Sequence, residues 1–256
     1  QISSFGPDVL RVATFNLYAP GNHSDSTYQR WGIELGAKAD VLLLTEVVDQ
    51  RRAELLGYAA GMPYVVKMSD GDTAIASRTA LYNVQTRVID PPGRLSSNNS
   101  SILSVQSDIA GFPHQFIATH WGIRDANDVL MGPAVSSQSR KLAAQTIVDM
   151  TPPSTVLALV GGDFNAYSGF GPQDHDGNPA TLDYVGSTNE VDLLRTWFVD
   201  SFTGMELVND AHCSNQRIDY VLVRGPYVPV KYEACFLEAS PSDHPFVLVT
   251  FEAGDG

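Results

Sequence analysis

A carboxylate and a carboxamide stand two residues apart, directly after an apolar segment. Asp163 and Asn165 follow the run 155–161, which is bounded by Pro153 and by glycines and is typical of a buried strand. If strand geometry continues through them, both side chains point to one side of the chain and Phe164 points to the core. An anionic acceptor beside an amide donor suits the handling of a water molecule and a phosphoryl oxygen. The same Gly-Asp-Phe-Asn sequence is also typical of an Asx-turn after a strand.

Residues of the same chemical kind end or interrupt several other apolar segments. Burying a bare carboxylate costs several kcal/mol unless a metal ion or hydrogen bonds compensate for the lost water. One such residue usually marks a strand end in solvent, but four carboxylates with two Asn and two His are better explained by one shared site. The residues outside the 163–165 segment are Asn16, Glu46, His120, Asp219, Asp243 and His244.

The hydrophobic periodicity predicts many strands and few helices. Strands are expected near residues 9–16, 41–47, 63–68, 73–89, 101–108, 114–121, 155–162, 217–223, 228–237 and 245–252, and helices near 26–38, 137–150 and 190–198. The second helix is expected to bury Leu142, Ala143, Ile147 and Val148 and to leave Arg140, Lys141 and Asp149 in solvent. This pattern indicates two stacked sheets with helices outside.

The ordered motifs resemble the endonuclease/exonuclease/phosphatase superfamily, the DNase I-like hydrolases. They are Thr14-Phe15-Asn16, Leu43-Leu44-Thr45-Glu46, Ala118-Thr119-His120, Gly162-Asp163-Phe164-Asn165, Arg217-Ile218-Asp219-Tyr220-Val221 and Ser242-Asp243-His244. The segment Ala74-Ile75-Ala76-Ser77-Arg78 is also similar, and the resemblance extends from Arg11 to Phe251. It implies one catalytic domain over residues 1–256, with the α/β fold of a four-layer sandwich in which helices flank two stacked mixed β-sheets.

The resemblance also implies a metal site and a base for phosphodiester hydrolysis. Glu46 would be the main ligand of Mg²⁺, which prefers oxygen ligands, with Mn²⁺ or Ca²⁺ as alternative ions. Asn16 would share the metal shell or hydrogen-bond the phosphate, and Asp243 would complete the shell or orient His120. Asp163 would orient and deprotonate the attacking water, while Asn165 would hold a phosphoryl oxygen.

Two imidazoles complete the set that the resemblance implies. His244 would donate to the phosphate or act as general acid/base, with its tautomer fixed by Asp219. His120 would donate to the phosphoryl group from the other side. Arg124 and Arg78 are the expected contacts to substrate phosphate, although Arg124 is equally compatible with a solvated loop residue. The roles of Asp70 or Asp72 before the 74–78 segment, and of Asp174-His175-Asp176, stay open.

Charge argues against tight, non-specific binding to long nucleic acid, because the net charge is −13 and the sequence pI is about 4.7. A divalent cation and a local arginine patch could offset this field. Arginines of such a patch would be Arg51, Arg52, Arg78, Arg94 and Arg124. The expected partner is therefore nucleic acid or another phosphodiester, and the expected enzyme a nuclease. The alternatives are a phospholipase C-type sphingomyelinase, a small-molecule phosphatase, or a catalytically idle binding module.

Two specific enzyme classes have their own sequence requirements. A sphingomyelinase would need an exposed apolar hairpin for membrane contact, and residues 225–230 are the only candidate. An abasic-site endonuclease would carry an acidic residue two positions after Asn16, where Tyr18 stands, so abasic-site repair is not expected.

The compartment is inferred from the chain start and the cysteines. The sequence begins at Gln1, as a processed mature protein would, and contains only Cys213 and Cys235, which would close a loop of about twenty residues if bridged. We expect a secreted or periplasmic protein, with two free buried thiols in a cytosolic protein as the alternative. The longest apolar runs are too short to span a bilayer, so we expect no stable membrane insertion, and we expect a monomer.

Overall fold

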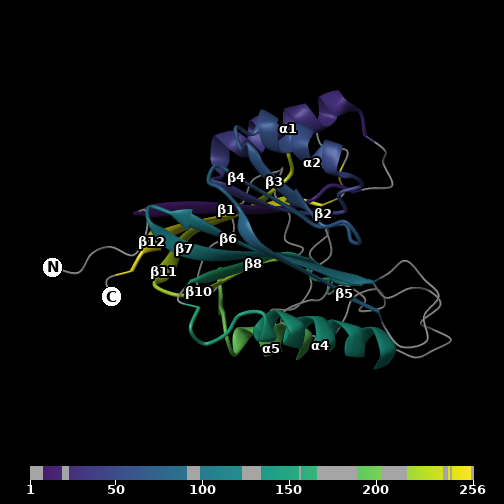
Figure 1. Ribbon diagram of the computed structural model, residues 1–256, viewed down its shortest axis with the longest axis vertical. Helices are drawn as coiled ribbons and strands as arrows, with labels where there is room; N and C mark the ends of the chain where they lie inside the picture. The colour runs from purple at the N-terminus through teal and green to yellow at the C-terminus, as the bar shows by residue number, and fades with distance from the viewer. Residues whose placement is uncertain are drawn as a thin grey trace.

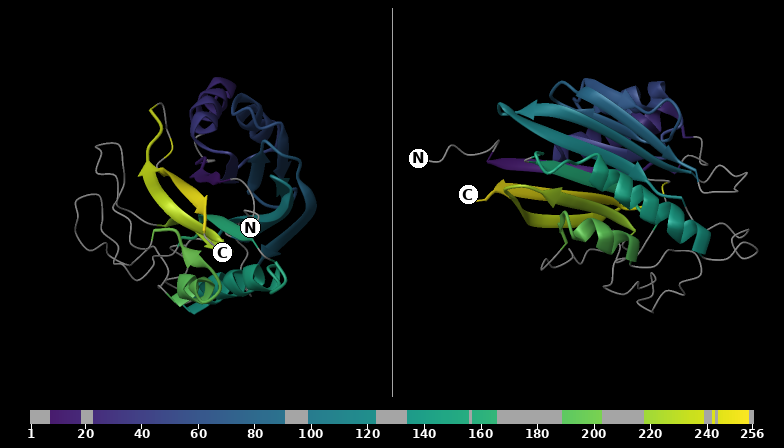
Figure 2. Two further views of the ribbon diagram at one scale, coloured as in Figure 1. Left: turned by 90° about the vertical axis from the view of Figure 1, so that its left-hand side faces the viewer. Right: turned by 60° about the horizontal axis from the view of Figure 1, so that its bottom comes forward.

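Two six-stranded mixed β-sheets lie face to face and carry helices on their outer faces (Figure 1). The computed structural model describes residues 8–18, 23–90, 99–122, 134–155, 157–165, 189–202, 218–238, 242 and 244–254. Figure 2 shows one pair of helices on the outer face of one sheet and another pair on the outer face of the other sheet, so the order of layers is helix, sheet, sheet, helix. The predicted four-layer α/β sandwich is confirmed.

The strand order places the termini of the described chain side by side. The first sheet runs β11 (Tyr227–Cys235), β12 (Phe246–Ala253), β1 (Val9–Asn16), β2 (Val41–Thr45), β4 (Ala74–Ser77) and β3 (Tyr64–Lys67). The second runs β5 (Tyr82–Ile89), β6 (Ser100–Ile109), β7 (Phe112–His120), β8 (Ala158–Asp163), β10 (Asp219–Arg224) and β9 (Val199–Asp200). Helices α1 (Asp25–Lys38) and α2 (Gln50–Ala59) cover the first sheet, and α4 (Ala134–Asp149) and α5 (Asn189–Arg195) cover the second (Figure 1).

Each sheet contains one central pair of parallel strands, β1 with β2 and β7 with β8, and the other described strand pairs are antiparallel. A parallel pair needs a crossover connection, and α1 and α4 lie in those two connections. The carboxyl ends of parallel strands meet at one edge of a sheet, which is where α/β proteins bind ligands. In both sheets, these carboxyl ends carry the polar residues of the predicted site.

Three apolar clusters hold the layers together. In β2, Val41 and Leu43 pack between the sheets, while Leu42 and Leu44 pack under α1 and α2. This burial on both faces explains why the strand is apolar throughout. The third cluster lies under α4 and α5 and contains Phe164, so the predicted inward direction of that ring is confirmed.

The structure corrects two predicted elements. Residues 73–89 form two strands, β4 and β5, and these belong to different sheets, because the chain turns between them and crosses the sandwich. Helix α2 was not predicted, although its signals are present. Asp49 caps it by accepting a hydrogen bond from the Arg52 amide at 2.8 Å, and Ala53 and Leu56 are buried at helical spacing.

The predicted faces of α4 are wrong at two positions. Ala143, Ile147 and Val148 are buried as expected, but Leu142 is half exposed and Arg140 is only 2% exposed. Arg140 can be buried because Glu190 of α5 faces it, with Nε and Oε1 3.8 Å apart. Periodicity within one helix cannot anticipate a charge partner on another helix. No helix in the described part of the chain is long and apolar enough to cross a membrane.

Candidate active site

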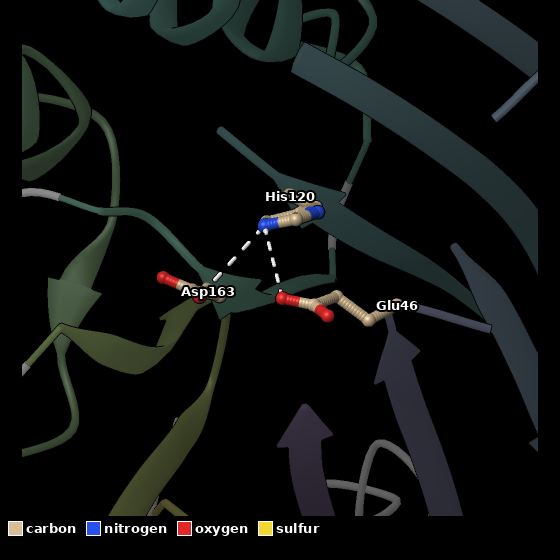
Figure 3. Close-up of side chains that lie close together, drawn as sticks. All are labelled: Glu46, His120 and Asp163. Carbon is tan, nitrogen blue, oxygen red and sulfur yellow. Dashed lines mark ion pairs between the residues drawn. The ribbon is translucent and has the colours of Figure 1, made fainter. Parts of the chain in front are cut away.

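Polar side chains from both sheets meet where the two parallel strand pairs end. Asn16 is the last residue of β1, Glu46 follows β2, His120 ends β7 and Asp163 ends β8. Asp163 is in register with His120 on one side and with Asp219, the first residue of β10, on the other. Figure 3 shows Glu46 reaching from the first sheet toward His120 and Asp163 of the second. His244, just before β12, and Asp72, just before β4, complete the cluster.

Asn16 joins the two sheets at this site. Its Nδ2 donates to Glu46 Oε1 and to Asp163 Oδ2, both at 3.0 Å, and its Oδ1 accepts from the Tyr18 amide at 2.9 Å. A flipped amide would face two carboxylates with its oxygen, so these partners fix the orientation. Asn16 therefore clamps both carboxylates in place, and its predicted place in a metal shell or at the phosphate remains a prediction.

Three residues of the site edge have a left-handed backbone without being glycine. They are Tyr18 with φ 53°, Glu46 with φ 55° and Asn165 with φ 45°. This conformation is costly for residues with a side chain and persists where the surroundings determine it. The Val47 amide, for example, donates to the Asp72 carbonyl at 2.7 Å directly after Glu46. The chain is thus sharply bent just after β1, β2 and β8, the strands that carry Asn16, Glu46 and Asp163.

The segment after β8 is a turn, which corrects the prediction that strand geometry continues to Asn165. Asp163 Oδ1 accepts from the Asn165 amide at 2.8 Å, the hydrogen bond of an Asx-turn. Asn165 Nδ2 donates to the Trp121 carbonyl at 2.7 Å. Asn165 therefore ties β8 to the end of β7, and its predicted contact with a phosphoryl oxygen remains a prediction.

A hydrogen bond to the Asp72 carboxylate orients His120 and favours its protonated form. Its Nδ1 lies 2.6 Å from Asp72 Oδ2, and Asp72 Oδ1 accepts from the Ser101 hydroxyl at 2.6 Å. Burial alone would lower the pKa of His120, but Asp72, Asp163 and Glu46 outweigh it and raise the pKa to about 9. The Nε2 atom faces Asp163 Oδ2 at 3.8 Å and Glu46 Oε1 at 4.0 Å (Figure 3). At neutral pH, His120 is therefore a cationic donor aimed into the cluster.

A second carboxylate–imidazole pair lies on the other side of Asp163. His244 Nδ1 is 2.8 Å from Asp219 Oδ2, and His244 Nε2 is 3.7 Å from Asp163 Oδ2. Burial raises the pKa of Asp219 to about 6, with His244 acting against it and Asp163 in favour. Above that pH, the Asp219 carboxylate accepts a hydrogen bond from His244 Nδ1. The other ring nitrogen of His244, Nε2, faces Asp163. The predicted contact between Asp219 and His244 is present.

A divalent cation fits this cluster. The four described carboxylates of the cluster, Glu46, Asp72, Asp163 and Asp219, outnumber its two imidazoles. Carboxylate oxygens of Glu46 and Asp163 lie within 4.8 Å of each other, and so do carboxylate oxygens of Asp163 and Asp219. Asp219 Oδ1 is buried without a hydrogen-bond partner among the described residues. Oxygen donors of this kind suit Mg²⁺ and similar hard cations.

Other predicted contacts are not brought to the cluster. Arg78 lies at the end of the first sheet opposite to the site. Ser77, just before it, is in register with Val41, which is the first residue of β2, whereas Glu46 follows the last. Its Nη2 donates to the Gly36 carbonyl at 2.6 Å near the end of α1. This corrects its expected role as a phosphate contact. Asp243, Arg124, Arg94 and residues 174–176 lie outside the described residues, so their roles remain predictions.

Two arginines at the edge that carries the site are already paired with acids. Arg51 forms an ion pair with Asp25, and Arg52 forms one with Asp49. They lie in the first turn of α2, which follows β2 and Glu46. Their positive charge is thus largely balanced before any substrate binds.

Two positioning residues were missed or left undecided from the sequence. The choice between Asp70 and Asp72 is settled by the hydrogen bond that Asp72 Oδ2 accepts from His120 Nδ1. Ser242 is buried, donates to the Asn16 carbonyl at 2.8 Å and accepts from the His244 amide at 3.1 Å. Its place two residues before His244 is the signature of a hydroxyl turn, a signal that is present in the sequence.

Known structures share this fold at low sequence identity. The humanized TDP2 of D. rerio has a TM-score of 0.66 and 16% identity, covering 96% of this chain and 100% of that one. An endonuclease/exonuclease/phosphatase family protein from Bacteroides thetaiotaomicron has a TM-score of 0.67 and 17% identity, covering 97% and 96%. The mannosyl-6-phosphatase Bt3783 of B. thetaiotaomicron has a TM-score of 0.63 and 17% identity, covering 94% and 99%.

The sequence comparison agrees with the fold. No curated protein matches this sequence. The sequence model of the Endonuclease/Exonuclease/phosphatase family, in contrast, matches residues 13–244, which include every described residue of the cluster. This chain therefore belongs to the endonuclease/exonuclease/phosphatase family, whose members are hydrolases that act on phosphoesters.

Proposed function

We propose that this protein is a divalent-metal-dependent phosphodiester hydrolase, with nucleic acid as the first substrate to test. The observation that carries the proposal is the set of donors around Asp163 Oδ2. Asn16 Nδ2 lies 3.0 Å from it, and the Nε2 atoms of His120 and His244 lie 3.8 Å and 3.7 Å away. Each imidazole has its own carboxylate behind it, so one central acceptor is flanked by two oriented donors.

These residues divide the work of hydrolysis. Asp163 orients the attacking water and accepts its proton. His120 and His244 present Nε2 to the phosphoryl oxygens and to the leaving group from opposite sides of Asp163. Glu46 and Asp163 would hold the divalent cation, which neutralises charge on the phosphoryl group when bound. Asn16 keeps both carboxylates in register and excludes a direct repulsive contact between them.

A nuclease is supported by one neighbour and opposed by the local charge. D. rerio TDP2, 16% identical with a TM-score of 0.65, was solved with a single-strand DNA product. In this chain, however, Arg51 and Arg52, which lie in the first turn of α2 after Glu46, are paired with Asp25 and Asp49. A polyanion would gain little from them. A catalytically idle module is disfavoured, because the two imidazole–carboxylate pairs and the clamp are all in place.

Hydrolysis of a small phosphoester is the second candidate, and the charge observation favours it. With a net charge of −13 and paired arginines, the protein has no described positive surface for a long phosphate backbone near the site. A small ester needs only the central cluster. One neighbour with this fold is a mannosyl-6-phosphatase.

The hairpin considered for membrane contact does not serve a sphingomyelinase site. Residues 225–226 turn between β10 and β11, and β10 begins at Asp219 in the cluster and runs six residues away from it. The turn is therefore about 20 Å from the site, at the opposite edge of the second sheet. A lipid held at this turn could not reach His120 or Asp163.

Salt dependence separates the two candidates. We measure cleavage of plasmid DNA, RNA and bis-p-nitrophenyl phosphate with Mg²⁺, Mn²⁺, Ca²⁺ or chelator, over a range of monovalent salt. A nuclease that contacts several phosphates loses activity steeply with salt, while turnover of the small diester changes little. His244→Ala, purified identically, excludes a contaminating nuclease. If the small diester is cleaved but DNA and RNA are not, the nuclease is ruled out and the small-ester hydrolase stands.

We also propose a secreted or periplasmic protein with a Cys213–Cys235 disulfide. Cys213 lies outside the described residues, and no free thiol is present among the described ones. Reduction should lower the free energy of unfolding by ~3 kcal/mol in the chain-entropy model, measured by urea denaturation with and without reductant. The Cys213→Ser/Cys235→Ser variant should show the same loss and no response to reductant. An equal stability of oxidised and reduced protein would contradict the bridge.

A further inference from the structure

The chain directly after His120 is fixed by four hydrogen bonds. The Trp121 amide donates to the Asp163 carbonyl at 2.9 Å, and the Trp121 carbonyl accepts from Asn165 Nδ2 at 2.7 Å. The Gly122 amide donates to Ser100 Oγ at 3.0 Å, and the Gly122 carbonyl accepts from Arg140 Nη1 at 3.2 Å. Every backbone polar group of these two residues therefore has a partner: Asp163 and Ser100 lie in strands of the second sheet, and Asn165 lies in the turn after β8.

Arg140 is the exception, since it reaches this segment from α4 in the outer layer. It is 2% exposed, and Glu190 of α5, which is fully buried, faces its Nε at 3.8 Å. A buried ion pair costs desolvation that apolar side chains of similar size would not cost, so it is weak evidence for stability. Its position between two helices and the strand end that carries His120 suggests a different use.

We propose that Arg140, oriented by Glu190, is a positioning residue that holds the end of β7 and thereby His120 and Asn165. Only the expected changes in kcat and KM rest on the proposed hydrolase function. A cationic donor to the Gly122 carbonyl is stronger than a neutral one, and it fixes the chain two residues after the imidazole. Because Asn165 donates a hydrogen bond to the Trp121 carbonyl, fixing this segment also fixes the turn after Asp163.

The test compares two ion pairs of α5 with matched substitutions. Arg140→Met/Glu190→Gln removes the pair that reaches Gly122. Arg195→Met/Asp200→Asn removes a second pair of the same helix, in which Arg195 Nε lies 3.2 Å from Asp200 Oδ2 and which bonds no described residue of the site. Arg140→Lys keeps a cationic donor. Amide hydrogen exchange of Trp121 and Gly122 is measured by NMR, together with the melting temperature and with kcat and KM for bis-p-nitrophenyl phosphate.

The Arg140 pair variant should exchange both amides about tenfold faster or more, and its kcat should fall about 10-fold to 100-fold with KM unchanged. Its melting temperature and the exchange of Ile117, in the middle of β7, should stay near wild type. Arg140→Lys should recover most of both losses, and the Arg195 pair variant should change neither.

Unchanged exchange at Trp121 and Gly122 would overturn the proposal, and so would faster exchange with full kcat in an active enzyme. If the wild-type protein hydrolyses no phosphoester, the proposed function fails, and the exchange rates alone decide the positioning role. If the Arg140 pair variant does not fold, Arg140→Gln, whose side chain is too short to reach Gly122, is measured in its place with the same criteria.

Discussion

Asp219→Asn should lower kcat/KM by about 10³-fold to 10⁴-fold, by analogy with the loss when the Asp of a Ser-His-Asp triad becomes Asn. Asp219 Oδ2 lies 2.8 Å from His244 Nδ1 and stabilises the positive imidazole, whose Nε2 faces Asp163 as a donor. An asparagine carries no negative charge to stabilise the imidazolium and can itself donate to Nδ1, so His244 would lose its function as a donor at Nε2. The effect corresponds to about 4–5.5 kcal/mol of transition-state stabilisation.

The double variant decides whether the two side chains act as a unit. Asp219→Asn/His244→Ala should be hardly worse than His244→Ala alone, because residues that act together lose activity non-additively. Asp40→Asn is the control: it removes the same charge beside Arg11, at the opposite edge of the first sheet, and should leave kcat unchanged. Strictly additive losses would show that Asp219 and His244 work independently.

Glu46→Gln should raise the Mg²⁺ concentration for half-maximal activity by about tenfold or more. The substitution keeps the side-chain length and an oxygen that can accept from Asn16 Nδ2, now 3.0 Å from Oε1, but it removes a negative charge. Activity titrations and calorimetric Mg²⁺ titrations measure the change. Glu54→Gln, on the exposed face of α2, removes the same charge away from the cluster and should leave the midpoint unchanged.

The same variant should be more stable than wild type in chelator. The described carboxylates of the cluster outnumber its imidazoles, so removing one carboxylate relieves repulsion in the metal-free protein. The melting temperature in chelator should therefore rise while metal affinity falls. An unchanged Mg²⁺ midpoint would remove Glu46 from the metal site, whatever the melting temperature shows.

The sequence by itself determined the edge at which the site lies. Apolar runs that end in Asn16, Glu46, His120 and Asp163 predict strands whose polar ends must share a site, because isolated burial of each would be too costly. The same periodicity predicted the strand-rich sandwich, since a strand buried on both faces, such as β2, must be apolar throughout. These are local properties of the chain, and local patterns report them.

Only the tertiary structure decided which residues contact one another across the layers. Asp72 rather than Asp70 faces His120, and Arg78 lies at the end of the first sheet away from the site. The turn after β8 lets Asn165 donate to the Trp121 carbonyl. Arg140 is buried because Glu190 comes from another helix. Each of these depends on partners more than fifteen residues away in the chain or on strand register, and neither is encoded in the spacing within one segment. The motifs thus fixed which chemistry is available, and the packing of two sheets fixed which side chain performs it.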